Sequence, residues 1–242
     1  MTDRRRVMLE PAFVLHVRAY RDSSRIIDAF TQHHGRVALV AHGIRRPHSR
    51  LRPAAEPFRP LLLSWSGRGS LHTLTAAEAG GPPGALGGDP LLGAWYVNEL
   101  LLRLLERDDQ HSALFAHYAR TLAELAGGTH PARVLRRFEK ALLDELGYGL
   151  NLERDIVSAQ PVRPDRRYRF DFEAGPIEID AASGGAEAFS GASLLALASG
   201  ELNDESALLD ARRLLRSTLD RYLGGRPLKS REVAHAMRKS RP

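Results

Sequence analysis

Two periodicities divide the chain. In the first third, apolar and polar residues alternate in short runs, as Phe13, Leu15 and Val17 do with His16 and Arg18. Alternation of this kind is typical of half-buried β-strands. We predict five strands, near residues 13–18, 24–31, 36–44, 57–66 and 70–75. Five strands in so short a segment leave exposed edges unless the sheet closes, which favours a small β-barrel of the OB-fold type over residues 1–79.

The connection between the third and fourth predicted strands follows neither pattern. Residues 43–56 are rich in basic residues and contain Pro47 and Pro53. We predict a mobile basic loop on the rim of the barrel.

Beyond the barrel the period becomes helical. Residues 80–89 are dominated by glycine and proline, which predicts a linker and a domain boundary. Apolar stripes predict helices at 90–107, 111–126, 131–147 and 204–222, with shorter ones at 193–199 and 231–239. A β-hairpin is expected at 167–180, inside an insertion at about 155–185. The expected architecture is therefore α+β, with a barrel followed by an α-helical bundle domain over residues 90–242.

Composition indicates the cellular compartment in which the protein acts. The chain has no cysteine, which excludes disulfides and thiolate zinc sites and favours a reducing cytoplasm. No apolar run approaches the ~20 residues of a membrane span. The basic residues at 1–6 are not followed by an apolar stretch, so no signal peptide is expected.

Positive charge is concentrated in the first third. Residues 1–80 carry 13 arginines and six acidic residues, whereas residues 81–242 carry 22 basic and 23 acidic residues. A concentrated positive field suits a polyanion such as nucleic acid, although it could also be a solvated basic face that only aids solubility. The candidate phosphate-binding residues are Arg36, His42, Arg45, Arg46, Arg50, Arg52, Arg59 and Arg68.

Base stacking is expected to contribute little. Trp65 shares a strand face with Leu61 and Leu63, which favours a place in the core, as is also expected for Phe13 and Phe30. Binding would then depend on counterion release and have no sequence preference. A protein that holds backbones leaves the base edges available for pairing.

Several stretches, taken together, resemble the RecO family of DNA repair proteins. In the first third these are AFVLH at 12–16, DAFT at 28–31, GRV at 35–37, AHG at 41–43, PFRPLLL at 57–63, GRG at 67–69 and LTAAE at 74–78. In the remainder they are YVNELL at 96–101, LRRFE at 135–139, LGYG at 146–149, YLGG at 222–225 and PLKSRE at 227–232.

This resemblance implies a role and partners. RecO proteins bind single- and double-stranded DNA, anneal complementary strands, and cooperate with RecR, and in some lineages RecF, to load RecA onto strands coated by single-stranded-DNA-binding protein (SSB). They contact the acidic, hydrophobic C-terminal tail of SSB through the helical domain. Many members carry a four-cysteine zinc cluster that would fall at about 155–185, so this chain is expected to be a zinc-free member, acting as a monomer without cofactors.

A second basic group is the candidate site for that tail. An acidic peptide ending in an apolar residue needs an apolar pocket with a cation at its edge. The same pattern also fits an ordinary amphipathic helix with a charged outer face. The candidate residues are Arg133, Arg136, Arg137 and Lys140 on the third predicted helix, with Lys229 and Arg231 near the C-terminus.

Two other functions fit parts of the pattern. An RNA-binding OB-fold protein would also need basic strands, and competition between single-stranded DNA and RNA would separate the two. Asp171, Glu173, Glu178 and Asp180 could suggest a two-metal nuclease, but no motif with a general base accompanies them. No Walker motif is present, so ATP hydrolysis is not expected.

Overall fold

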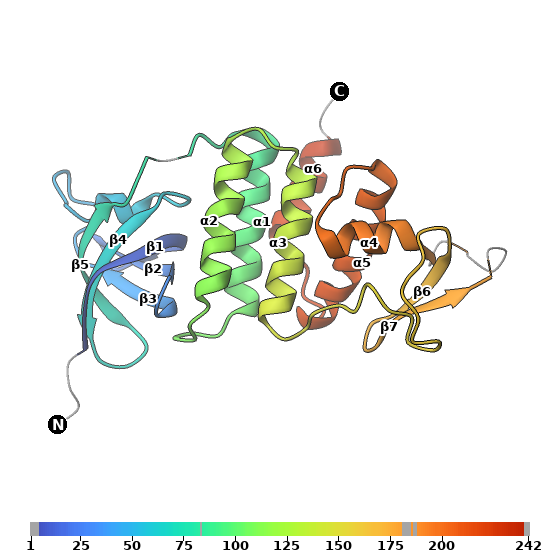
Figure 1. The fold of residues 1–242 in the computed structure, drawn as a ribbon. Coiled ribbons are helices and arrows are strands. Elements are labelled where there is room, and N and C mark those ends of the chain that lie inside the picture. The colour runs from blue at the N-terminus through green and yellow to red at the C-terminus, as the bar shows by residue number, and fades with distance from the viewer. Residues whose placement is uncertain (1–4, 83, 181–184, 186–187, 240–242) are drawn as a thin grey trace. The chain divides into compact units, whose positions relative to one another are not determined.

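The fold is given by a computed structural model, shown in Figure 1, which describes residues 5–82, 84–180, 185 and 188–239. Contacts divide the chain into two compact units. One consists of Met1–Gly128 with Pro227–Pro242, and the other of Thr129–Arg226. Residues 1–4, 83, 181–184, 186–187 and 240–242 lie outside the described residues. They include parts of the predicted linker and insertion.

The first unit contains the predicted barrel. Its strands are β1 (Arg5–Tyr20), β2 (Ser24–Thr31), β3 (Gly35–Ala41), β4 (Leu61–Gly67) and β5 (His72–Ala79). They close in the order β1-β2-β3-β5-β4. All neighbours are antiparallel except β3 and β5, which pair in parallel through Leu39 with His72 and Val40 with Thr73. The predicted OB-type barrel is therefore confirmed.

β1 is longer than the sequence pattern indicated. The register of β1 shifts between Val7 and Glu10 against β4, and between Val14 and His16 against β2. Bulges bend a strand, and here they let the first half of β1 pair with β4 and the second half with β2. Because each bulge also breaks the alternation of side chains, the pattern revealed only the stretch from Phe13 onward.

β4 begins four residues later than expected. Pro57 and Pro60 have no amide hydrogen for a strand ladder, and Phe58 between them adopts a left-handed backbone with φ of +63°. The barrel interior is filled by apolar side chains that include Val14, Leu39 and Leu63. Trp65 is 2% exposed and belongs to this core, as predicted.

Two helices cover part of the outer surface of β1 and β2. Helices α1 (Gly88–Leu104) and α2 (Ser112–Ala126) belong to the same compact unit as the barrel. Phe13 and Phe30 of the barrel pack against Phe115 and Tyr118 of α2, with ring centroids 5.1–6.0 Å apart. The segment 80–89 therefore connects the barrel with α1 inside one compact unit. That it is also a domain boundary stays a prediction.

A buried hydrogen-bond chain joins α2, α1 and β1. The Tyr118 hydroxyl donates to Asn98 Oδ1 at 2.6 Å, and Asn98 Nδ2 donates to the carbonyl of Leu15 at 2.9 Å. Burial raises the pKa of Tyr118 far above its ordinary value, even though the bond to Asn98 acts in the opposite direction. The hydroxyl therefore stays protonated and remains a donor.

Helix α6 (Lys229–Lys239) completes this unit by packing on α1. The Glu99 carboxylate accepts hydrogen bonds from the amides of Lys229 and Ser230 and from the Ser230 hydroxyl, at 2.6–2.9 Å. A carboxylate is a favourable partner for the unpaired amides of a helix N-terminus. Glu99 thus attaches the start of α6 to α1.

The second unit is mainly helical. It contains α3 (Pro131–Glu145), α4 (Gly191–Ser199) and α5 (Glu205–Tyr222). The expected hairpin is formed by β6 (Arg167–Asp171) and β7 (Gly175–Ile179), and a third strand that was not predicted, β8 (Ala188–Ser190), pairs with β6. At three residues, β8 is too short for its alternation to be read from sequence.

A single carboxylate organises the start of the insertion. Asp155, 3% exposed, accepts hydrogen bonds from the amides of Val157, Ser158 and Glu178 and from the Ser158 hydroxyl, at 2.5–3.0 Å. Burial alone would raise the pKa of this carboxyl, but the hydrogen bonds outweigh burial and lower it below the ordinary value of 3.8. Asp155 therefore ties its own loop to β7.

Replacing Tyr118 with phenylalanine should destabilise the first unit. The variant removes the donor to Asn98 Oδ1 and leaves a buried acceptor unpaired, which costs about 1–3 kcal/mol of unfolding free energy. Both tryptophans, Trp65 and Trp95, lie in this unit, so urea unfolding followed by tryptophan fluorescence reports on it. The control is Tyr20→Phe, because Tyr20 is only half-buried and its hydroxyl makes no hydrogen bond within the described residues. Equal midpoints for the two variants would contradict the assignment.

Asp155→Ala should loosen the second unit by about 2–3 kcal/mol, because several hydrogen bonds to a buried charge are lost. Since the folded pKa of Asp155 is lowered, its contribution is present in full above the ordinary value of 3.8 and is lost as the pH falls through the lowered pKa. Hydrogen exchange of residues 151–179, measured at pH 7 and below pH ~4, checks both statements. Asp165→Asn, which changes a side chain that is 64% exposed, is the control and should leave exchange nearly unchanged.

Candidate nucleic-acid interface

The predicted loop between β3 and β4 is anchored to the barrel. It carries a short 3-10 helix, η1 (Arg52–Ala55), which the sequence did not reveal. Successive turns are closed by hydrogen bonds from the amides of Arg46, Ser49 and Arg52, at 3.0–3.3 Å. Ile44 and Ala54 are at most 4% exposed and reach into the barrel core. The loop thus holds its basic side chains on a defined backbone.

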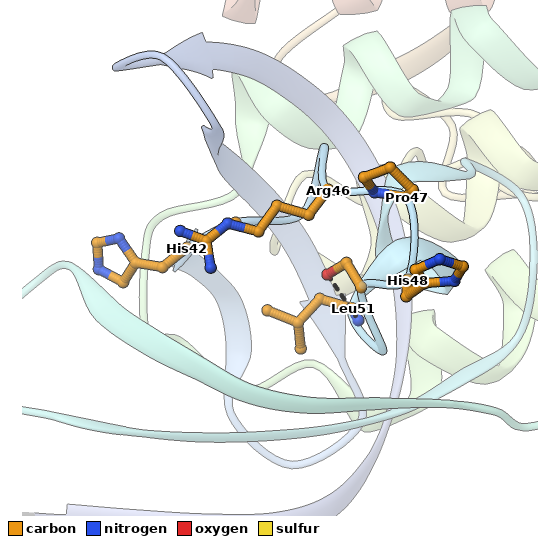
Figure 2. Close-up of a pocket in the computed structure, with 7 residues that line it drawn as sticks. His42, Arg46, Pro47, His48 and Leu51 are labelled. Atoms are coloured by element: carbon orange, nitrogen blue, oxygen red, sulfur yellow. Dashed lines mark hydrogen bonds between the residues drawn. The ribbon is translucent and has the colours of Figure 1, made fainter.

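The start of this loop forms a shallow, open hollow (Figure 2). Gly43 has a left-handed backbone with φ of +67°, and a Cβ placed there would lie 3.3 Å from Arg46 Cδ. Glycine therefore allows the Arg46 side chain to fold over the backbone, and Figure 2 shows it extending toward His42. His42 Nδ1 lies 3.3 Å from the Ser24 hydroxyl. The hollow is lined by His42, Gly43, Arg46, Pro47, His48, Ser49 and Leu51.

Arg45 connects the loop with the turn between β1 and β2. Its guanidinium donates to the carbonyl of Asp22 at 3.2 Å, and its amide donates to the carbonyl of Ser23 at 3.4 Å. Arg52 similarly donates to the carbonyl of Pro47 at 3.3 Å. Both side chains are exposed and bind carbonyl groups, and neither pairs with a carboxylate in the described part of the chain, so their positive charges remain uncompensated there.

Three further predicted residues point their charge to solvent. Arg46, Arg50 and Arg68 are exposed, and none of their guanidinium groups makes a hydrogen bond or ion pair within the described residues. Arg68 lies in the turn between β4 and β5. The turn follows Gly67, which pairs with Arg5 at the start of β1, so Arg68 lies near the first residues of that strand.

Two arginines of this region were not among the predicted residues. Arg21 lies in the β1–β2 turn that Arg45 contacts, with its guanidinium 5.3 Å from the centre of the Tyr20 ring. Arg18 is exposed near the end of β1. The sequence pattern shows that Arg18 lies in a strand and that Arg21 begins a turn. It does not show that this turn lies beside the basic loop.

Arg36 and Arg59 are used differently. The Arg36 guanidinium donates to the carbonyl of Leu105 at 3.0 and 3.2 Å and lies 3.8 Å from Asp28. Burial lowers the pKa of Arg36, and Asp28 offsets this only in part. Arg59 is paired with Glu56 at 3.1 Å, and its side chain is 24% exposed. We assign both residues to internal contacts and leave them out of the interface.

The predicted tail-binding residues fall in different units. Arg133, Arg136, Arg137 and Lys140 lie on α3 in the second unit, whereas Lys229 and Arg231 lie on α6 in the first. Arg136 is buried and paired with Glu139, which is also buried, so the expected cation already has a counter-charge. Arg231 donates to the Tyr96 hydroxyl at 3.3 Å.

The other residues of the α3 group also have partners. Arg133 donates to the carbonyl of Asn203 at 3.0 Å, and Lys140 pairs with Asp144 at 2.9 Å. Arg137 is exposed. The structure therefore does not bring the predicted set together as one site within either unit.

The carboxylates of the hairpin do not form a metal site in the described part of the chain. Asp171 accepts hydrogen bonds from the amides of Glu173 and Ala174, as expected for a turn residue. Glu178 lies 3.5 Å from Arg166. No group of three or more histidine or acidic residues within the described ranges could hold a metal ion. Among the described helices, none combines the length and apolar character needed to cross a bilayer.

Comparisons with known proteins agree across nearly the whole chain. Residues 6–82 match the family model "Recombination protein O N terminal", and residues 88–232 match "Recombination protein O C terminal". A protein from Azoarcus sp. (strain BH72), named DNA repair protein RecO, is 44% identical over 236 residues, which cover 96% of this chain and 97% of that protein. A protein of the same name from Coxiella burnetii (strain RSA 331) is 47% identical over 231 residues, covering 95% and 98%.

Proposed function

Because this chain belongs to the RecO family of DNA repair proteins, we propose that it is a non-enzymatic mediator of recombinational repair. In this role it binds single- and double-stranded DNA and anneals complementary strands. The observation that carries the proposal is a set of exposed arginines that pair with no carboxylate among the described residues. They lie on the basic loop, on the adjacent β1–β2 turn and on the β4–β5 turn. Arg45, Arg46, Arg50, Arg52 and Arg68 belong to this group, with His42 beside them and Arg18 and Arg21 added by the structure.

The interface is suited to phosphates rather than to particular bases. Guanidinium groups bind phosphate oxygens in two-pronged hydrogen bonds and remain charged at any physiological pH. Neutralising several phosphates releases counterions, which provides affinity without sequence preference. A protein that acts at any damaged sequence needs this property, and backbone contacts leave the base edges open for annealing.

The partners of the family are part of the proposal. We propose that the chain cooperates with RecR, and with RecF where it is present, to help load RecA onto strands coated by SSB, and that it binds the SSB C-terminal tail. The exposed Arg137 and the partly exposed Arg133 and Lys140 on α3 support tail binding through the second unit. The proposed setting is the cytoplasm, with the protein acting at the nucleoid as a monomer and without a metal or other cofactor.

Charge reversal on the basic loop tests the DNA interface. The double variant Arg46→Glu and Arg50→Glu should bind a single-stranded oligonucleotide at least tenfold more weakly, because two phosphate contacts become repulsive. The slope of log affinity against log salt should fall by about 1.4, at about 0.7 per phosphate on a single strand. Fluorescence anisotropy at several salt concentrations measures both quantities.

A matched control changes the net charge equally elsewhere. Arg120 on α2 and Arg216 on α5 are exposed and lie outside the proposed interface. The double variant Arg120→Glu and Arg216→Glu should reduce affinity only slightly through the overall field. If both double variants bind equally, the loop is not the interface.

Strand annealing tests the mediator role. The protein should accelerate the pairing of two complementary oligonucleotides that are each coated with SSB, and deletion of the SSB tail should reduce this acceleration. A fluorescence-quenching assay of duplex formation, with the uncoated strands as control, measures both rates. Failure to anneal coated strands when the tail is present would contradict the proposed function.

A further inference from the structure

A partly exposed tryptophan lies on α1 in the same unit as the barrel. The Trp95 side chain is 40% exposed, whereas Trp65 in the barrel core is 2% exposed. Tryptophan is highly buried on average, and an indole that is 40% exposed offers a flat apolar ring surface to a ligand.

Phe58 holds the indole in place. The two ring centroids are 4.9 Å apart, with an angle of 77° between the ring planes. Phe58 is 8% exposed and has the left-handed φ of +63°, a conformation that bulky side chains rarely adopt. Such strain persists where the surrounding structure imposes it and is concentrated at functional sites. Since the contact is edge-to-face, Phe58 covers at most one face of the indole.

The basic loop leads directly to this ring pair. Phe58 follows Leu51, which lines the hollow of the loop, by seven residues. Seven residues span at most about 25 Å, so the hollow and the indole lie within reach of one short oligonucleotide. The one acidic residue between 43 and 59 is Glu56, and Arg59 neutralises it at 3.1 Å. No uncompensated negative charge from this segment opposes a strand that passes from the loop to Trp95.

We propose that Trp95 stacks on a base of single-stranded DNA whose phosphates lie on the basic loop. This proposal rests on the proposed DNA-binding function and adds a base contact to an interface otherwise made of charge. Every base offers a flat π surface, so the contact needs no particular sequence. Bases within a duplex are already stacked, so Trp95 favours single strands over duplexes and distinguishes the substrate of annealing from its product.

Sequence reasoning missed this residue for a physical reason. The sequence points to the aromatic residues of the barrel strands as possible stacking partners, and those lie mainly in the core. Trp95 follows the glycine- and proline-rich segment and lies on a helix that the structure places in the same unit as the barrel.

The test compares three ligands of equal length: oligo(dT), an abasic strand with the same phosphates, and a duplex. The wild-type full-length protein should bind oligo(dT) about 5- to 150-fold more tightly than the abasic strand, as expected for one stacked base. Oligo(dT) should also quench tryptophan fluorescence more strongly than the duplex does. Trp95→Leu should remove the preference for oligo(dT) and most of the quenching while leaving duplex affinity within twofold, and Trp95→Phe should restore part of the preference.

Each other outcome has a definite meaning. Equal loss of affinity for oligo(dT) and the duplex in Trp95→Leu, or no loss for either, overturns the stacking proposal and leaves charge-based DNA binding standing. Failure of the wild-type protein to bind any of the three ligands overturns the proposed function itself.

The wild-type comparison of oligo(dT) with the abasic strand needs no variant. A folding defect in Trp95→Leu, detected by the emission of Trp65, would therefore not prevent the test. Equal wild-type affinity for these two strands overturns the stacking proposal, and Trp95 would then be a candidate surface for an apolar protein segment.

Discussion

The packing of α1 and α2 against the outer surface of the barrel determines where a ligand can bind. On this surface, the rings of Phe13 and Phe30 pack against those of Phe115 and Tyr118. Asn98 adds two buried hydrogen bonds, one to Tyr118 and one to the carbonyl of Leu15. OB-folds commonly bind oligonucleotides on strands 2 and 3 and on the turns β1–β2 and β4–β5. Here the helices occupy part of that strand surface, so the turns and the long β3–β4 loop remain, and these carry the uncompensated arginines.

Much of the fold could be predicted from the sequence because most elements obey one local periodicity. The barrel strands, the long helices and the hairpin at 167–180 each repeat an apolar pattern over several turns or pleats. The misplaced boundaries have local causes that interrupt the pattern. The bulges of β1 break its alternation, Pro57 and Pro60 delay β4, and η1 and β8 are too short to show a period.

The candidate site was predictable as a region but not residue by residue. In the sequence, Arg36 and Arg46 are equally good candidates for phosphate contacts. In the structure, Arg36 donates hydrogen bonds to a carbonyl 69 positions away, whereas the Arg46 side chain lies over Gly43 and faces solvent. Charge density along the chain identifies the segment that carries excess arginine. Only tertiary contacts, which no local pattern encodes, decide which guanidinium groups remain available and show that the β1–β2 turn lies beside the loop.

The order of the chain through its two units has a consequence for biosynthesis. The path leaves the barrel unit after residue 128, forms the second unit, and returns at Pro227 so that α6 can attach to Glu99. The second unit is thus an insertion within the first. On the ribosome it can fold as soon as its own residues emerge, whereas the unit that begins first is finished last, after residues 229–239 have left the exit tunnel.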